Sequence, residues 1–370
     1  MSQLFTPVSI GPLKLQNRIV IAPMCQYSAV DGKPTDWHTI HMGQMALSGA
    51  GMFIIEATAV EPIGRITHGC IGLYSDETEA ALKQTIDKVR QYSAMPIMIQ
   101  LAHAGRKASS YRPWEGGQLQ SQKDGGWETI GPSALPQLPD ETPPKAMTAE
   151  DLTRVREAFV QAVKRSARIG FNGIELHCAH GYLMHQFLSP IANQRKDEYG
   201  GSLENRMRYP LEVFKAMREA TPANMSLGVR ISATDWVEGG LTADESVEFG
   251  KKLKALGCDF IDVSSGGVSP AQKIPLGPKY QVPLATKIKQ GCGMPTMAVG
   301  LITTAQEAEG IVANAEADIV AVARAMMYDP RWPWHAAAEL GAQVDAPKQY
   351  WRSQPRELKD LFRDAKIGSR

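Results

Sequence analysis

The chain has 370 residues, 43% of them hydrophobic and 21% charged, which is typical of a folded globular protein and unlike a disordered one. Its 40 basic residues nearly match its 39 acidic ones, so a net charge of +1 leaves no electrostatic footprint for nucleic acid or an anionic membrane. The five cysteines include no CxxC pair, which argues against a disulfide framework, a zinc ribbon or an iron–sulfur site.

The N-terminal residues 1–18 (MSQLFTPVSIGPLKLQNR) lack the charged-then-apolar layout of a signal peptide. No apolar run along the chain approaches the 18 residues that suggest a membrane-spanning helix. We therefore expect a cytoplasmic protein that has neither a membrane nor a nucleic acid as its partner.

Eight short apolar runs alternate with helical patterns along the chain. They begin at Arg18 (RIVIAP), Met52 (MFIIEA), Pro96 (PIMIQLA), Gly173 (GIELH), Ser226 (SLGVRIS), Asp259 (DFIDVS), Pro295 (PTMAVG) and Asp318 (DIVAVA). Several are apolar throughout, as expected for parallel strands covered by helices. The pattern predicts an α/β fold, a (β/α)8 TIM barrel that occupies residues 1–370 as one domain. A doubly wound sheet is the alternative, but the GxGxxG turn that it favours after the first strand is missing.

Helix-capping residues mark the segments between these strands. Thr242 with Glu245 forms one capping box, and Thr303 with Gln306 repeats the pattern. Residues 148–170 frame another helix. Its apolar face comprises Leu152, Val155, Phe159 and Val163.

Two segments depart from the alternating pattern. Residues 104–147, which follow the third strand, are rich in Gly, Pro and Trp. A loop of this length is uncommon, and we interpret it as a lid or binding element, or equally as a surface excursion or subunit contact. The polar sequence of residues 353–370 predicts a terminal helix or a frayed tail.

Polar residues gather where the predicted strands end, which is where TIM barrels place their active sites. His177 and His180 follow the fourth strand, and three interpretations are open. As metal ligands they lack a clear third partner, and a purely structural pair is also possible. Two imidazoles that donate N–H groups to a carbonyl or nitro oxygen fit better, so we predict no metal site. A second pair, His38 and His41, lies in a helical stretch and is interpreted as structural.

Further residues at the same strand ends suggest proton transfer and anion binding. Beside the histidines, Tyr182 is a candidate proton donor, although a loop tyrosine alone more often packs. Arg230 ends the fifth strand and needs an anionic partner, either Glu175 or the edge of a reduced flavin. Cys25, after the first strand, is either inert packing or a redox group. The last three strands are followed by Gly266, Gly267, Val299, Gly300 and Arg324, a set that suggests a phosphate site.

These residues resemble the old yellow enzyme family, and most closely its thermophilic-like subclass, which includes xenobiotic reductases. The resemblance extends from Leu4 to about Arg352. Its most specific blocks are residues 22–27 (APMCQY), 56–60 (EATAV), 64–67 (GRIT), 100–107 (QLAHAGRK), 177–183 (HCAHGYL) and 193–206 (NQRKDEYGGSLENR).

The resemblance implies a tightly but non-covalently bound FMN and a transient NADPH or NADH. The flavin ring would be lined by Pro23, Met24, Cys25, Ala57, Gln100 and Arg230. The ribityl and phosphate groups would be held by Gly266, Gly267, Val299, Gly300, Ala323 and Arg324. His177 and His180 would bind the oxygen of the substrate, Tyr182 would be the proton donor, and Tyr27 would also reach the substrate.

Two departures from the family pattern concern the phosphate site and the C-terminus. Ala323 stands where the family usually has glycine, so the backbone there must tolerate a Cβ near the phosphate. The segment 349–352 (QYWR) resembles one through which a neighbouring subunit contributes an arginine, so Arg352 is a candidate substrate-binding residue in a homodimer or homotetramer.

The function implied is an FMN-dependent ene-reductase that passes hydride from NAD(P)H to the β-carbon of an enone, enal, maleimide or nitroalkene. One alternative is a flavin-free phosphate-binding lyase or aldolase with Lys107 as its Schiff-base nucleophile. Lys107 lies in a polar loop with nothing in the sequence to desolvate it, so we expect no lowered pKa there. A non-catalytic ligand-binding barrel is the other alternative, and it leaves the convergent His, Tyr, Arg and Cys unexplained.

Overall fold

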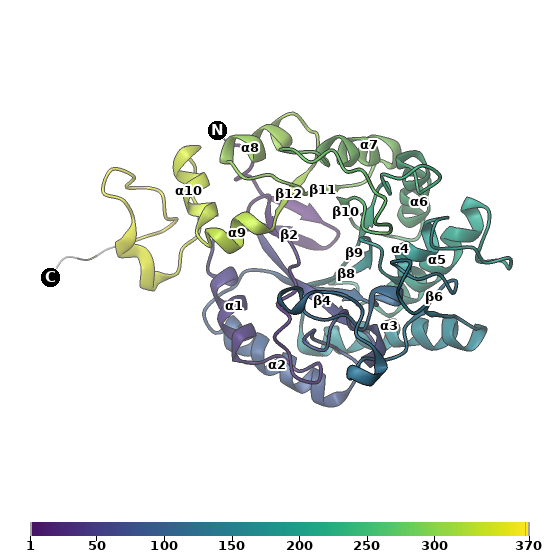
Figure 1. Ribbon diagram of the computed structural model, residues 1–370. Helices are drawn as coiled ribbons and strands as arrows, with labels where there is room; N and C mark the ends of the chain where they lie inside the picture. The colour runs from purple at the N-terminus through teal and green to yellow at the C-terminus, as the bar shows by residue number, and fades with distance from the viewer. Residues whose placement is uncertain (1, 367, 369–370) are drawn as a thin grey trace.

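The computed structural model describes residues 2–366 and 368, and at its centre is a closed barrel of parallel strands (Figure 1). The barrel strands are β3 (Ile19–Ile21), β4 (Met52–Ala59), β5 (Ile97–Ala102), β8 (Gly173–Cys178), β9 (Ser226–Ser232), β10 (Ile261–Ser264), β11 (Thr296–Ala298) and β12 (Ile319–Val322). They close in the order β10-β11-β12-β3-β4-β5-β8-β9. Each contains or begins within one of the eight predicted runs, so the predicted TIM barrel is confirmed.

Helices follow the barrel strands and form a ring around them (Figure 1). They are α1 (Asp36–Ala46), α2 (Asp76–Arg90), α3 (Ala149–Ile169), α4 (Leu183–Leu188), α5 (Leu203–Ala220), α6 (Ala243–Ala255), α7 (Val282–Cys292), α8 (Ala305–Ala313), α9 (Arg324–Tyr328) and α10 (Trp332–Glu339). Every residue of the eight barrel strands is buried, because helices cover the outside of the barrel and side chains fill the inside.

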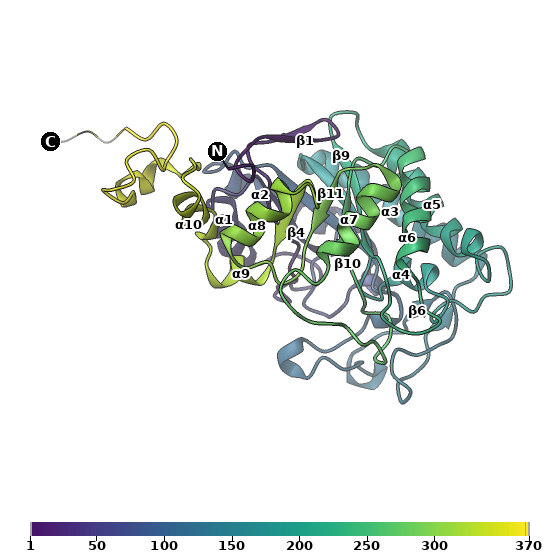
Figure 2. The same ribbon diagram turned by 90° about the horizontal axis from the view of Figure 1, so that it is seen from above.

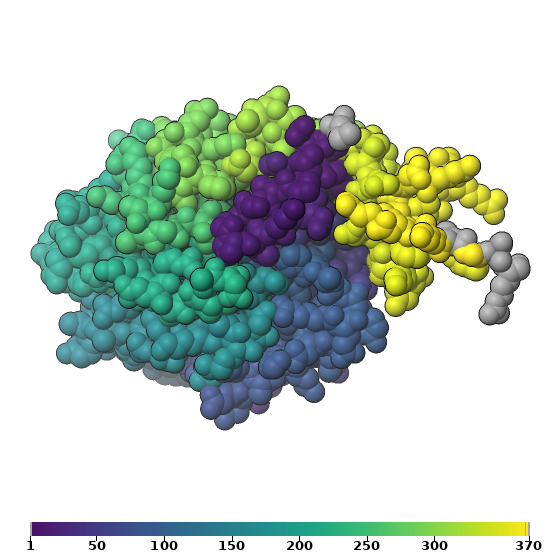
Figure 3. Space-filling view, turned by 180° about the vertical axis from the view of Figure 1, so that it is seen from behind, coloured from purple at the N-terminus to yellow at the C-terminus, as the bar shows by residue number. Residues whose placement is uncertain are grey.

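An N-terminal hairpin covers the end of the barrel at which the strands begin. It consists of β1 (Val8–Ile10) and β2 (Leu13–Leu15), and Ile10 and Leu15 are fully buried against interior side chains such as Val20 and Met52. Figure 2 shows this hairpin at the end of the molecule opposite the long loops, and Figure 3 shows it lying across the back of the molecule. The open rim is therefore the end at which the strands finish.

The caps of two helices follow the prediction and one does not. Thr242 and Glu245 form the predicted capping box of α6, and α3 begins after Thr148. The predicted box of Thr303 with Gln306 is wrong by one residue, because Thr304 caps α8 with Glu307. The Glu307 carboxylate accepts from the N–H groups of both threonines, and a negative charge suits the start of a helix better than the amide of Gln306.

The segment 104–147 folds into short elements rather than an open loop. It contains the 3₁₀ helices η2 (Gly105–Lys107), η3 (Pro113–Glu115) and η4 (Gln122–Asp124), and the short strands β6 (Ile130–Gly131) and β7 (Lys145–Ala146). A further 3₁₀ helix, η1 (Pro62–Gly64), follows β4. Together with the loop after β10, this segment surrounds the rim (Figure 2).

The C-terminal segment projects from one side of the barrel. After α10, η5 (Lys348–Ser353) and the residues that follow it extend away from the strands (Figure 1). Residues 357–366 form turns and one bridge, between Val344 and Phe362, so a terminal helix is not what the described part of this tail adopts. Among the described residues, no helix is long and apolar enough to cross a membrane.

Candidate active site

A layer of buried charged and polar side chains crosses the inside of the barrel below its rim. In the strand register, Arg230 on β9 pairs with His177 on β8 and with Asp262 on β10. Arg230 Nε lies 3.0 Å from Asp262 Oδ2. Gln100 Nε2 donates to Glu175 Oε1 at 2.8 Å. The closest carboxylate to Arg230 is thus Asp262, a residue that the sequence analysis overlooked because it sits inside an apolar run.

Burial controls the ionisation of this layer. It raises the pKa of Glu175 to about 8, with the negative charge of Asp262 adding to the effect and Arg230 opposing it. Burial likewise raises the pKa of Asp262, again against the charge of Arg230. Glu175 Oε2, both Asp262 oxygens and Arg230 Nε have no hydrogen-bond partner of good geometry among the described residues. Such buried groups fit a polar ligand, and the hydrogen-bonding edge of a flavin ring meets that need.

The two predicted imidazoles lie together at the rim. His177 Nε2 and His180 Nδ1 are 3.4 Å apart, and the ring planes meet at 87°. His177 Nδ1 accepts the N–H of Ala179, which places the ring proton of a neutral imidazole on Nε2, pointing away from the backbone. His180 Nε2 lies 2.7 Å from Ser264 Oγ. The Nε2–H of His177 thus points into the space between the two rings, where it is placed to donate to a ligand oxygen.

Both imidazoles are neutral at physiological pH. Burial, followed by the positive charge of Arg230, holds the pKa of His177 and of His180 well below the usual value. Neutral imidazoles donate hydrogen bonds without acting as strong acids. The described residues contain no group of three or more His, Cys, Asp or Glu side chains arranged to hold a metal ion.

Tyr182 packs edge-on against His177, with ring centroids 5.0 Å apart. Burial raises the pKa of its phenol well above the usual value, and the negative charge that a Cys25 thiolate would carry acts in the same direction. The phenol thus stays protonated and is able to donate a proton.

Lys107 corrects a prediction from the sequence. The segment after β5 folds inward, so that Lys107 Nζ donates to the carbonyls of His180 (2.8 Å) and Gly267 (3.1 Å) and lies 5.1 Å from the Tyr182 ring centroid. Burial, with the positive charge of Arg106 next in importance, lowers the pKa of Lys107 to about 8. The expectation that nothing desolvates this lysine is wrong, because its surroundings come from segments remote in sequence.

Cys25 and Tyr27 lie at the rim on the segment that follows β3. A hydrogen bond with Cys70, followed by burial, raises the pKa of the half-buried Cys25 thiol, so Cys25 remains a thiol rather than a thiolate. Tyr27 meets Trp114 edge-on at 5.8 Å. Trp114 is 65% exposed and belongs to η3, so the long segment after β5 reaches the site.

A separate cavity of about 170 Å³ lies where the last barrel strands end. Its lining comprises Arg230, Ser264, Tyr280, Gln281, Val299, Gly300, Leu301, Ile302, Thr303, Ala321, Ala323, Arg324 and Ala325. Arg324 is exposed and makes no ion pair with any described residue, so its guanidinium is available to an anion such as a phosphate. Tyr280 and Gln281 were missed from the sequence, because they follow an irregular loop that carries no motif.

Gly266 and Gly267 lie outside this cavity. The Gly266 N–H donates to the Thr234 carbonyl, and the Gly267 N–H donates to Gln272 Oε1. A Cβ on Gly267 would stand 2.5 Å from the backbone of His180, so this glycine permits close packing against the histidine turn. The structure therefore does not bring these two glycines to the cavity with Gly300 and Arg324.

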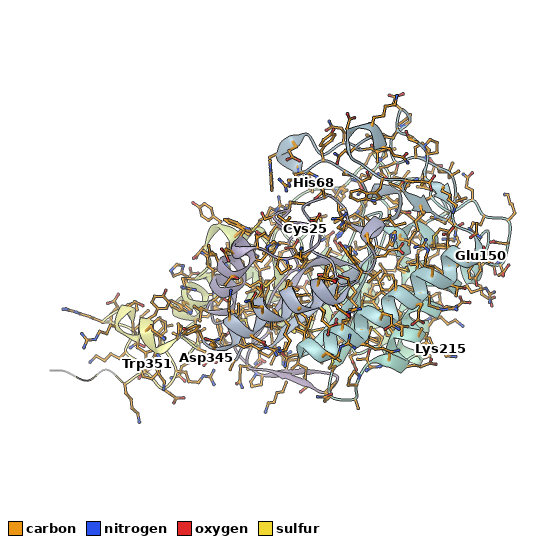
Figure 4. All side chains as sticks on the ribbon, turned by 90° about the horizontal axis from the view of Figure 1, so that it is seen from below. Cys25, His68, Glu150, Lys215, Asp345 and Trp351 are labelled. Atoms are coloured by element: carbon orange, nitrogen blue, oxygen red, sulfur yellow. The ribbon has the colours of Figure 1, made fainter. Side chains whose placement is uncertain are left out.

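Arg352 also lies apart from the other predicted residues. It is exposed in η5, within the projecting C-terminal segment. Figure 4 labels its neighbour Trp351 at the tip of this segment and Cys25 in the body of the molecule, well separated. The structure therefore does not bring Arg352 to the predicted site of its own chain.

The second histidine pair has the surroundings of structural residues. His38 is fully buried, accepts the Thr35 N–H at Nδ1 and has its Nε2 3.3 Å from Glu56. His41 is 8% exposed and packs edge-on against Phe53. These contacts support the structural interpretation.

Comparison with known proteins agrees with this geometry. Residues 3–343 match the model of the NADH:flavin oxidoreductase / NADH oxidase family. The chain is 43% identical over 351 residues to an NADPH dehydrogenase of Geobacillus thermodenitrificans, covering 94% of this chain and 98% of the relative. Among solved structures, morphinone reductase is similar with a TM-score of 0.76 and 26% identity, covering 99% of this chain and 94% of that one. A 2-naphthoyl-CoA reductase has a TM-score of 0.82 and 26% identity, covering 92% of this chain and 52% of that one.

A parallel barrel with this rim and these relatives is an NAD(P)H-dependent flavin oxidoreductase that acts on a small molecule, with FMN as its cofactor. More particularly, the chain belongs to the NADH:flavin oxidoreductase / NADH oxidase family, the old yellow enzymes, as its sequence motifs predict.

Proposed function

We propose that the protein is an ene-reductase that reduces carbon–carbon double bonds activated by a carbonyl or nitro group. The observation that carries the proposal is the pairing of two neutral imidazoles with a protonated phenol at the barrel rim. Bound FMN would supply the hydride chemistry, the transfer of hydride from NAD(P)H to the β-carbon of the alkene. The residues of the chain bind, polarise and protonate the substrate.

His177 and His180 would donate hydrogen bonds to the electron-withdrawing oxygen of the substrate. Negative charge grows on that oxygen as hydride arrives, so these donors stabilise the transition state more than the ground state. Tyr182, whose ring contacts His177, would give its proton to the α-carbon. Tyr27 would contact the substrate from the side on which Trp114 lies, and we propose the segment 104–147 as a partial lid there.

The proposed flavin site has two parts. Pro23, Met24, Cys25, Ala57, Gln100 and Arg230 would surround the ring, with the unpartnered polar atoms of the buried layer below it. Val299, Gly300, Ala323 and Arg324 would hold the phosphate in the cavity of about 170 Å³. Gly267 would help indirectly, by letting the chain pack closely against His180, and Gly266 by letting the side chain of Gln272 approach the turn.

We also propose that the enzyme works as an oligomer in which Arg352 reaches the site of a neighbouring copy. The support is the position of Arg352 on an exposed, projecting segment, away from the site of its own chain. An Arg352→Ala oligomer with unchanged substrate KM would contradict this role.

The aldolase alternative gains no support from the altered pKa of Lys107. Its Nζ donates to two backbone carbonyls and lies over the Tyr182 ring, contacts that favour the charged ammonium over the neutral amine that Schiff-base formation requires. The partners of Lys107 instead indicate a role in holding the rim together.

The test of the proposed function uses the purified FMN-loaded enzyme under anaerobic conditions. NADPH should bleach the flavin absorption near ~450 nm, a band of any oxidised flavin, and an enone, maleimide or nitroalkene should restore it. His177→Ala and His180→Ala should slow the second step far more for these substrates than for an artificial electron acceptor such as ferricyanide. Bleaching that no activated alkene reverses would contradict the proposal.

A further inference from the structure

The turn formed by His180 and Gly181 has an uncommon backbone conformation. Both residues have positive φ, 59° for His180 and 74° for Gly181, although His180 carries a side chain. Such a conformation costs free energy and persists where the surrounding structure fixes it. A Cβ on Gly181 would stand 2.2 Å from the Gly267 carbonyl oxygen, so the turn is also tightly packed.

Side chains from three separate parts of the chain satisfy every backbone polar group of this turn. The His180 N–H donates to Ser232 Oγ (2.9 Å), and the His180 carbonyl accepts from Lys107 Nζ (2.8 Å). The Gly181 N–H donates to His185 Nδ1 (2.8 Å), and the Gly181 carbonyl accepts from Gln186 Nε2 (2.7 Å). The turn is closed by one backbone hydrogen bond, from the Tyr182 N–H to the Ala179 carbonyl (3.1 Å), and side chains satisfy the four polar groups within it.

A second buried group orients His185. Its Nε2 lies 2.8 Å from Asp235 Oδ1, and both side chains are completely buried. The other carboxylate oxygen of Asp235 accepts from Ser189 Oγ (2.6 Å) and from the Leu241 N–H (2.7 Å). Because His185 Nδ1 accepts the Gly181 N–H, the ring proton must be on Nε2, where it points at the carboxylate.

We propose that His185 and Asp235 are positioning residues for substrate binding. They hold the Gly181 N–H and thereby fix the His180 imidazole where it meets the substrate oxygen. The inference rests on the role proposed above for His180. A buried His–Asp pair resembles a catalytic dyad, but both nitrogens of His185 are already hydrogen-bonded, so the pair acts through the turn. A proton on His185 Nδ1 would face the Gly181 N–H, and two donors cannot form a hydrogen bond with each other.

The test compares two substitutions at one position in the FMN-loaded enzyme. His185→Ala removes the hydrogen bonds of the imidazole to the Gly181 N–H and to Asp235. In His185→Asn, the amide oxygen of the asparagine can accept from the Gly181 N–H, but the shorter side chain cannot reach Asp235. We expect His185→Ala to raise the KM for cyclohexenone by roughly 10- to 100-fold, with a smaller effect on kcat, because small displacements of a binding group have large kinetic effects. His185→Asn should recover part of this loss.

A second readout is independent of catalysis. For peptides that cover residues 178–183, hydrogen–deuterium exchange should be faster in His185→Ala than in wild type. Exchange in His185→Asn should be slower than in His185→Ala. The matched control is His41→Ala, which removes another buried imidazole, on α1, outside the turn. This control should alter stability without changing the cyclohexenone KM or the exchange of residues 178–183.

Unchanged KM and unchanged exchange in His185→Ala would overturn the proposal. If His185→Ala does not fold, Asp235→Asn replaces it, because the asparagine amide must oppose either the Leu241 N–H or His185 Nε2, and the same rise in KM is expected. His180→Ala separates this inference from the proposed function. A normal KM in His180→Ala removes the role of the imidazole itself, whereas a raised KM there with normal KM in the other variants removes only the positioning pair.

Discussion

Asp262 Oδ2 lies 3.0 Å from Arg230 Nε on the neighbouring barrel strand, and the two residues share one register position. Asp262 is completely buried and Arg230 is 6% exposed, so water screens this pair little. In the proposed function, Arg230 faces the edge of the flavin ring that becomes negative on reduction. Asp262 therefore competes with the reduced flavin for the same positive charge.

Replacing Asp262 by asparagine should raise the midpoint potential of the bound FMN. Without the carboxylate, the charge of Arg230 acts fully on the reduced ring and stabilises it. We expect a positive shift of about 30 mV or more, which corresponds to a tenfold change in a two-electron equilibrium. The measurement is a potentiometric titration, with Asp259→Asn as the control, because Asp259 also pairs with an arginine, Arg218, but at the opposite end of β10. A shift of equal size in the control would argue against the pairing.

The pH dependence of stability should reveal the buried carboxyl of Glu175. Its pKa rises from an ordinary 4.5 to about 8 through burial, with Asp262 contributing and Arg230 opposing. A raised pKa means that the folded state holds the proton more tightly than the unfolded state. The contribution of Glu175 to the free energy of unfolding is therefore fully present below about pH 4.5 and is lost as the pH rises through about 8. Glu175→Gln stays neutral, so its stability relative to wild type should increase across that interval.

Urea unfolding of the flavin-free protein at several pH values measures this difference. Glu204→Gln, which replaces a glutamate near the start of α5 for which no role is proposed, is the control and should leave the pH profile as in wild type. Parallel profiles for Glu175→Gln and wild type would show that Glu175 is ionised in the folded protein.

Tyr182→Phe should separate proton transfer from hydride transfer. The change keeps the ring that packs on His177 and removes the proton. We expect the rate of alkene reduction to fall by roughly 100-fold or more, as is typical on loss of a general acid, while flavin reduction by NADPH stays unchanged. Rapid-mixing absorbance measurements resolve the two half-reactions. If both rates match those of wild type, water rather than Tyr182 is the proton donor. Tyr74→Phe, which removes a phenol remote from the imidazole pair, serves as the control.

Two substitutions in the phosphate cavity should have unequal effects on FMN affinity. Gly300 has φ of 119°, and a Cβ there would stand 2.6 Å from Gln281 Nε2, so Gly300→Ala should lose FMN readily. Ala323 has a negative φ of −108°, outside the left-handed region that favours glycine, so Ala323→Gly should change FMN affinity by less than about threefold. Fluorescence titration of flavin-free protein with FMN provides the affinities. Equal losses in the two variants would contradict this reasoning.

The sequence predicts the barrel well because its strands are buried on both faces and appear as short, mostly apolar runs. It also predicts that His177, His180, Tyr182 and Arg230 meet, because they follow or end parallel strands whose C-terminal ends share one rim. Contacts between remote segments are different. The burial of Lys107 depends on the carbonyls of His180 and Gly267, and no local pattern indicates them.

Asp262 and the glycine pair show the same limit. Asp262 stands within an apolar run that gives no local sign of a buried charge. Only its register with Arg230 on the neighbouring strand indicates that its side chain lies inside the barrel. Gly266 and Gly267 follow a strand end as phosphate-binding glycines do, but their N–H groups already have partners. A glycine after a strand indicates close approach of some group, and the sequence does not say whether that group is a ligand or another part of the chain.

The N-terminal hairpin β1–β2 seals the base of a barrel whose interior is already packed with side chains. With Ile10 and Leu15 seated in its base, nothing the size of a nicotinamide can leave by the route opposite to its entry. In the proposed function, the hydride donor and the alkene therefore both enter from the rim at which the strands end, and the oxidised nicotinamide leaves before the alkene binds.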